Sequence, residues 1–187
     1  MDLLFSNFSY FWRVYFGIEI WQFALLCLIC LLPAFLIFYN EIKTKDRLAL
    51  VKLILTAIYL ASLIAIPLLG RQTTAERQII LNPFFDIARL HNNTLRIHLL
   101  RAVISNTLFF IPLGLITSMK IKAHTIIKAL IIGFVLSLLI EGLQYLLMRG
   151  ILEGADLLCN TIGSVLGASI YLVYKKILSK YKGEIHV

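Results

Sequence analysis

Long blocks of Leu, Ile, Val, Ala and Phe dominate this chain and restrict its fold more than any other feature. A helix that crosses the hydrocarbon core of a bilayer needs about 20 mainly apolar residues. Five blocks reach about that length, at residues 20–39, 49–69, 102–119, 126–148 and 156–174. With 60% hydrophobic residues among 187, the chain is too apolar for a soluble domain of this size. The sequence therefore predicts an all-α fold, a polytopic bundle of about five transmembrane helices in the cell membrane.

The positions of Lys and Arg predict how these spans are oriented, because cytoplasmic loops carry an excess of both. With five spans, one face receives eleven of these cations: Lys43, Lys45, Arg47, Lys52, Lys120, Lys122, Lys128, Lys175, Lys176, Lys180 and Lys182. The other face receives seven: Arg13, Arg71, Arg77, Arg89, Arg96, Arg101 and Arg149. We therefore expect the N-terminus outside the cell and the C-terminus in the cytoplasm.

The cations of the predicted outer face are all arginine, whereas those of the inner face are nearly all lysine. Arginine binds carboxylates and phosphates through paired hydrogen bonds. An anionic partner at the outer face would explain the difference, although codon bias in a small sample would also produce it.

Three parts of the chain differ in composition. Residues 1–19 are rich in aromatic side chains, which favour the level of the lipid headgroups, so we expect an interfacial segment. Residues 20–174 are expected to form a single transmembrane helical domain, and residues 175–187 a basic cytoplasmic tail. The long connection at 70–101 contains Asn82 and Pro83, a helix-start signal. We expect a short amphipathic helix there, in the outer interface.

The sequence carries few motifs of known chemistry. His91 and His98 lack further metal ligands at suitable spacing, so we read them as surface residues and expect no metal and no cofactor. Cys27 and Cys30 form a C-x-x-C within a span, where cysteine usually acts as a small apolar residue and not as a redox centre. No G-x-S-x-G or Cys–His pair is present, and no nucleic-acid partner is expected.

A row of polar residues interrupts the last two apolar blocks. Glu141 and Gln144 share one helix face at i and i+3. Asp156 and Asn160 follow after a short turn with Arg149, in one stripe with Gly163 and Gly167. Ionisable groups inside a membrane are costly and usually mark a site or a specific contact. We expect these residues to form a pocket, with the G-x-x-x-G stripe packing span 156–174 closely on span 126–148.

Each member of this row also has a structural explanation. Asp156 would serve as the N-cap of its span, and Gln144 and Asn160 would join helices by hydrogen bonds. Glu141 needs a cation or a proton in low dielectric, and Arg71 and Arg149 are the available cations. In span 102–119, Asn106 lies near Pro112, which either only bends the helix or makes room for the same polar pocket.

The same residues resemble a known family. The run from Glu141 to Gly167 resembles the C-terminal signature of the VanZ-like membrane proteins, with its Glu, Gln, Arg, Asp and N-x-x-G-x-x-x-G. Two upstream elements are also similar: Asn106 to Gly114, and Arg71 with Asn82-Pro83-Phe84. The resemblance covers about residues 50–174. It implies a small bacterial membrane protein, and the name-giving member is linked to resistance to the glycopeptide teicoplanin.

Three functions stay open. The first is an envelope protein that binds an anionic ligand near the outer leaflet, such as a lipid-linked cell-wall precursor, and lowers susceptibility to a lipidated glycopeptide. The second is an intramembrane hydrolase or transferase acting on a lipid phosphate or acyl group, with Glu141 or Asp156 as general base. The third is a structural or assembly protein that uses G-x-x-x-G contacts, in which the polar row only holds helices together. The expected partners are membrane lipids and further copies of the chain, joined through helix packing. The candidate ligand-binding residues are Arg71, Asn106, Glu141, Gln144, Arg149, Asp156 and Asn160.

Overall fold

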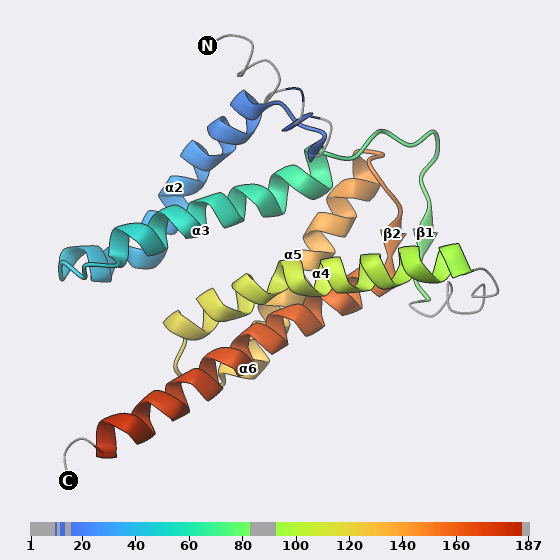
Figure 1. Ribbon diagram of the computed structural model, residues 1–187. Helices are drawn as coiled ribbons and strands as arrows, with labels where there is room; N and C mark the ends of the chain where they lie inside the picture. Colours follow the sequence, from blue (N-terminus) through green and yellow to red (C-terminus); the bar gives the residue numbers. More distant parts are fainter. Residues whose placement is uncertain (1–9, 11, 14–15, 83–92, 185–187) are drawn as a thin grey trace. The chain divides into compact units, whose positions relative to one another are not determined.

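The computed structural model describes residues 10, 12–13, 16–82 and 93–184 (Figure 1). Within them, five helices are long and apolar enough to cross a membrane. Each coincides with one predicted span: α2 (Ile20–Lys43), α3 (Ala49–Ile64) with the π-helix η1 (Ala65–Leu69), α4 (Asn93–Lys120), α5 (Thr125–Leu146) and α6 (Gly154–Glu184). The prediction of an all-α, multi-pass membrane protein is therefore confirmed.

Two short strands accompany the helices. Strand β1 (Ile79–Ile80) pairs in parallel with β2 (Leu152–Glu153), with Ile79 opposite Leu152 (Figure 1). The sequence did not predict this pairing, which ties the long connection to the turn before α6. The predicted outer-interface helix after Asn82, and His91, lie outside the described residues, as does most of the predicted interfacial segment 1–19.

The described chain divides into two compact units. Unit 1 comprises Met1–Arg77 and Leu143–Gly150, and unit 2 comprises Gln78–Gly142 and Ile151–Val187. We describe each unit by itself, and the assignment of residues 20–174 to a single domain stays a prediction.

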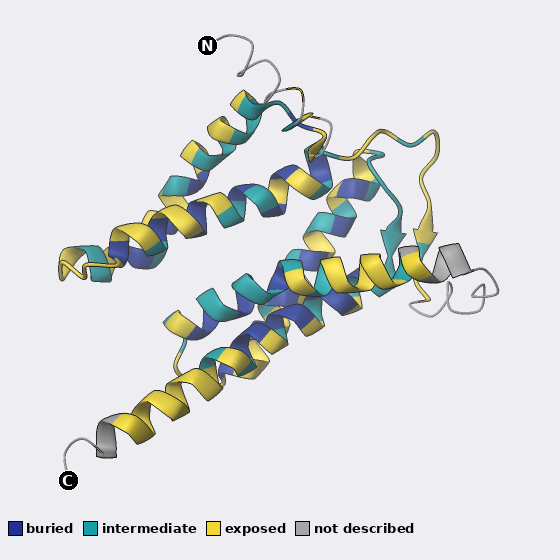
Figure 2. Cartoon of the chain, in the orientation of Figure 1, coloured by how far each residue is buried: buried dark blue, intermediate teal, exposed yellow. Residues whose placement is uncertain are grey.

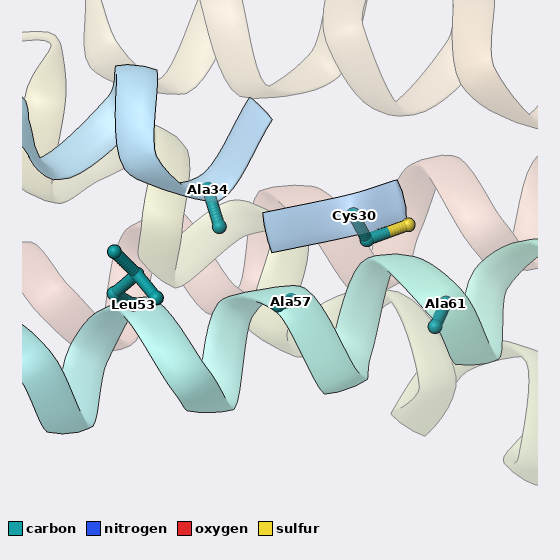
Figure 3. Close-up of a cluster of buried hydrophobic side chains, with 5 residues drawn as sticks. All are labelled: Cys30, Ala34, Leu53, Ala57 and Ala61. Atoms are coloured by element: carbon teal, nitrogen blue, oxygen red, sulfur yellow. The ribbon is translucent and has the colours of Figure 1, made fainter. Parts of the chain in front are cut away.

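Small side chains form the interface between α2 and α3 in unit 1. Cys30 and Ala34 of α2 lie against Leu53, Ala57 and Ala61 of α3, and all five are buried (Figure 3). Small residues let two helix backbones approach closely in a membrane, where the hydrophobic effect does not drive helices together. Cys30 thus acts as a small apolar residue in a packed cluster, and it forms no disulfide.

The loop between α2 and α3 is closed by an ion pair. Lys52 Nζ lies 2.6 Å from Asp46 Oδ2, and the Leu48 N–H donates to the same carboxylate. The Lys52 hydrogen bond, followed by that of Leu48, holds the pKa of Asp46 below its ordinary value. Lys45, with φ 57°, lies in the left-handed region just after α2 ends, a common way to terminate a helix.

Helices α4 and α6 pack along one another in unit 2 (Figure 1). Most of the large apolar side chains of the five helices are not covered by other parts of the protein, including many in α2 (Figure 2). In water such surfaces would aggregate, but in a bilayer the lipid chains solvate them. The burial pattern therefore agrees with helices that face lipid.

Candidate functional site

The predicted site residues fall into two groups. Arg71, Gln144 and Arg149 belong to unit 1. Unit 2 holds the other four, Asn106, Glu141, Asp156 and Asn160. In unit 1, Gln144 contacts Arg71, and in unit 2, Asn106 contacts Asp156. The convergence of all seven residues on one pocket stays a prediction.

Arg149 caps the C-terminal end of the second span. The last carbonyl groups of a helix have no partner within it. Arg149 Nη1 lies 3.1 Å from the carbonyl oxygens of both Leu68 and Leu69, and 3.4 Å from that of Arg71. A cation is favourable at this negative end of the helix dipole. A guanidinium has five N–H donors, and those on Nε and Nη2 are not used in these three bonds.

Gln144 links Arg71 to the same helix end. Its side chain is 1% exposed, its Oε1 accepts from Arg71 Nη1 at 3.4 Å, and its Nε2 donates to the Pro67 carbonyl at 3.2 Å. Gly150 has a φ of 150°, and a Cβ there would lie 2.8 Å from Arg71 Nη1. Glycine at this position therefore leaves the space that Arg71 occupies beside Gln144.

Residues 71–77 run along the end of α5. The Thr74 N–H donates to the Met148 carbonyl at 2.7 Å, and its hydroxyl donates to the same oxygen at 3.2 Å. Arg77 lies over the Tyr145 ring at 5.8 Å and donates to the Leu146 carbonyl. These contacts bring Arg71 and Arg149, distant in sequence, to one place in unit 1.

A cavity of about 540 Å³ opens beside these two arginines. We call it the arginine cavity; its lining residues are Gly17, Gln22, Leu69, Arg71, Gln72, Thr73 and Arg149. A second cavity, of about 710 Å³, shares Gly17, Arg71 and Gln72 with it and is completed by Arg13, Phe16, Ile66 and Gly70. We call this second one the neighbouring cavity. Of the described residues that line the two cavities, none is acidic.

Asp156 is held by Asn106 in unit 2. Asn106 Nδ2 donates to Asp156 Oδ1 across the contact between α4 and α6, and Asp156 is 9% exposed. The expectation that Asp156 is the N-cap of its span is wrong, because α6 begins at Gly154 and Asp156 lies inside the first turn. A carboxylate there still interacts favourably with the helix dipole.

Glu141 and Asn160 are both buried in unit 2. Glu141 is 2% exposed, and its Oε2 accepts from the Glu153 backbone N–H in β2 at 3.2 Å. Asn160 Nδ2 donates to Ser137 Oγ at 2.8 Å, which joins α6 to α5. Among the described residues, Asn160 Oδ1 has no hydrogen-bond partner, although Asn160 is only 5% exposed. A buried acceptor without a partner costs about 1–3 kcal/mol.

The glycine stripe of α6 packs on a different helix than predicted. A Cβ on Gly163 would overlap the Thr107 carbonyl of α4, and one on Gly167 would overlap the Ile111 carbonyl. The stripe therefore faces α4, and the prediction that it faces span 126–148 is wrong. Helix α5 instead meets α6 through Ser164, whose Oγ donates to the Ala129 carbonyl at 2.8 Å.

Comparison of the sequence with known proteins identifies its family. The model of the VanZ/LLP1 family matches residues 48–175. The chain belongs to the VanZ/LLP1 family. It is also 27% identical over 135 residues to Protein VanZ of Enterococcus faecium, an alignment that covers 68% of this chain and 78% of that protein. No solved structure matches the chain.

The VanZ/LLP1 match contains all seven predicted site residues, but it begins after Gly17 and Gln22. Sequence reasoning missed these two residues, together with Gln72 and Thr73, as lining residues of a cavity. Gln22 did carry a signal, since Glu19 and Gln22 have the spacing of a capping box. Nothing in the linear pattern indicated that this box would lie beside Arg71.

Proposed function

We propose that this chain is a bacterial cell-envelope protein that binds an anionic ligand, lipid-linked or derived from the cell wall, and so contributes to teicoplanin resistance. The arginine cavity is the observation that carries the proposal. Arg71 and Arg149 line it beside the side-chain amides of Gln22 and Gln72 and the Thr73 hydroxyl. Guanidinium groups bind phosphate and carboxylate through charge-assisted hydrogen bonds, so this lining suits an anion.

The predicted topology puts the cavity at the outer leaflet. Arg71 follows the end of the second span, and Gln22 lies at the start of the first. With the N-terminus outside, both ends lie at the level of the outer headgroups, where an anionic headgroup meets arginine. The resistance itself is proposed from the family, whose name-giving member is linked to teicoplanin.

The buried group in unit 2 belongs to the proposal as a second set of ligand-binding residues: Asn106, Glu141, Asp156 and Asn160. Its two buried carboxylates also favour a second candidate function, an intramembrane hydrolase or transferase. A carboxylate placed beside a bound substrate is the kind of group that acts as a general base.

Protection of a susceptible host against teicoplanin tests the proposal. We expect Arg71→Gln to abolish protection, because losing charge-assisted bonds of about 1.5–3 kcal/mol weakens binding roughly 10- to 100-fold. Arg47→Gln, in the loop after α2, removes the same charge away from the cavity and should keep protection. Membrane levels of every variant are measured alongside.

Full protection by Arg71→Gln at wild-type protein levels would contradict the proposal. Glu141→Gln separates the two candidate functions, because it keeps the shape of the side chain and removes its charge. Loss of protection with ligand binding intact would favour the enzyme. Loss that only follows lower protein levels would make Glu141 structural.

A further inference from the structure

The segment at the start of α2, residues 16–22, forms part of the arginine cavity, although it lies outside the residues that match the family. Gly17 and Gln22 line the cavity together with Arg71 and Arg149. The family match begins at residue 48. One wall of the cavity is therefore contributed by a part of this chain that the family pattern does not include.

The position of this wall is set by close packing. Gly17 has a φ of 69°, which favours glycine, and a Cβ there would overlap the Gly70 carbonyl. Ile18 is 2% exposed. The Trp12 ring packs on Phe16 at 4.5 Å and on Phe23 at 5.4 Å. The segment is thereby held against both the end of η1 and the start of α2.

Gln22 lines the cavity with a side chain that carries hydrogen-bond donors. Its Oε1 accepts from the Glu19 backbone N–H at 3.0 Å and so completes the capping box of α2. Because the oxygen is used in the cap, the group of the side chain that remains for a ligand is the Nε2 amide, with two N–H donors. Donors suit the oxygens of an anion.

The neighbouring cavity adds an apolar side to this site. Phe16 and Ile66 line it, and each is 38% exposed. It shares Arg71 with the arginine cavity, so one arginine borders both spaces. A ligand that filled both would carry an anionic group near Arg71 and Gln22 and a hydrocarbon part near Phe16.

We propose that residues 16–22 complete the anion site of this chain and make it selective for a phosphate-bearing amphiphile of net negative charge. Gln22 Nε2 donates to a phosphate oxygen that Arg71 and Arg149 also bind, and Phe16 and Ile66 contact the attached hydrocarbon. This inference rests on the proposed function and adds to it the chemical class of the ligand and a second wall of the site.

Binding is measured by native mass spectrometry on the full chain in detergent. The probes are dioctanoyl phosphatidic acid, dioctanoyl phosphatidylcholine and inorganic phosphate. Gln22→Glu is the central variant, because glutamate keeps the oxygen that caps α2 but replaces the donors with a negative charge. Asn40→Asp adds the same charge at the other end of α2 and is the matched control.

We expect wild type to bind phosphatidic acid in preference to both other probes, Gln22→Glu to bind it at least about ten-fold more weakly, and Asn40→Asp to bind it as wild type. If inorganic phosphate bound as tightly as phosphatidic acid, the inference that the ligand is an amphiphile would be overturned. Wild-type binding by Gln22→Glu, with binding lost in Arg71→Gln, would overturn the role of the segment and leave the proposed function standing. Wild-type binding by both variants would overturn the two together.

Thermal unfolding of Gln22→Glu is recorded as a check on folding. If this variant is unstable, Gln22→Met, which removes the donors without adding charge, is measured in its place and should also weaken binding.

Discussion

At the scale of single residues, Gln144 offers a sharp test because both ends of its buried amide are used. Its Oε1 accepts from Arg71 and its Nε2 donates to the Pro67 carbonyl. We expect Gln144→Leu to lower the free energy of unfolding in detergent by about 1–3 kcal/mol, since a buried carbonyl loses its donor. Gln72→Leu, at an exposed position, should change it by less than about 0.5 kcal/mol. Equal stability of Gln144→Leu and wild type would mean that the amide does not hold the helix end.

At the scale of elements, one substitution at two glycines tests how α6 packs on α4. A Cβ on Gly167 would overlap the Ile111 carbonyl, whereas one on Gly142 of α5 meets nothing within 4 Å. We expect Gly167→Ala to lower the melting temperature in detergent, because the new Cβ would overlap backbone atoms of α4 and force the two helices apart. Gly142→Ala should leave it unchanged or raise stability by about 0.5–1 kcal/mol through helix propensity. The same response at both positions would refute the close contact between α4 and α6.

At the scale of the whole molecule, the orientation in the membrane decides which compartment the arginine cavity faces. An odd number of spans puts the two termini on opposite sides, and the excess of lysine predicts that the C-terminus lies in the cytoplasm. In a background without the three native cysteines, we expect Asn93→Cys to react with an impermeant maleimide in intact cells. Lys45→Cys should react only after the cells are opened. The reverse pattern would place the cavity at the cytoplasmic face.

The sequence alone determined the spans and the family. Whether about 20 consecutive residues are apolar is a local property, and each of the five predicted blocks coincides with a helix. The polar residues of the candidate site were recognisable for the same reason, because a charge or amide within such a block is conspicuous. Glu141, Gln144, Asp156 and Asn160 are indeed buried.

The partners of these residues were decided by tertiary structure. A glycine stripe marks a close approach without specifying the neighbour, so Gly163 and Gly167 could not reveal that they face α4. Asn160 pairs with Ser137, and Asn106 with Asp156, because helix rotation and crossing bring them together. The arginine cavity depends on Gly17 lying against Gly70 and on Arg149 reaching the end of η1. The hydrophobicity of a span depends only on consecutive residues, so it can be read from the sequence. These contacts depend on how closely helix backbones approach one another, which only the tertiary structure decides.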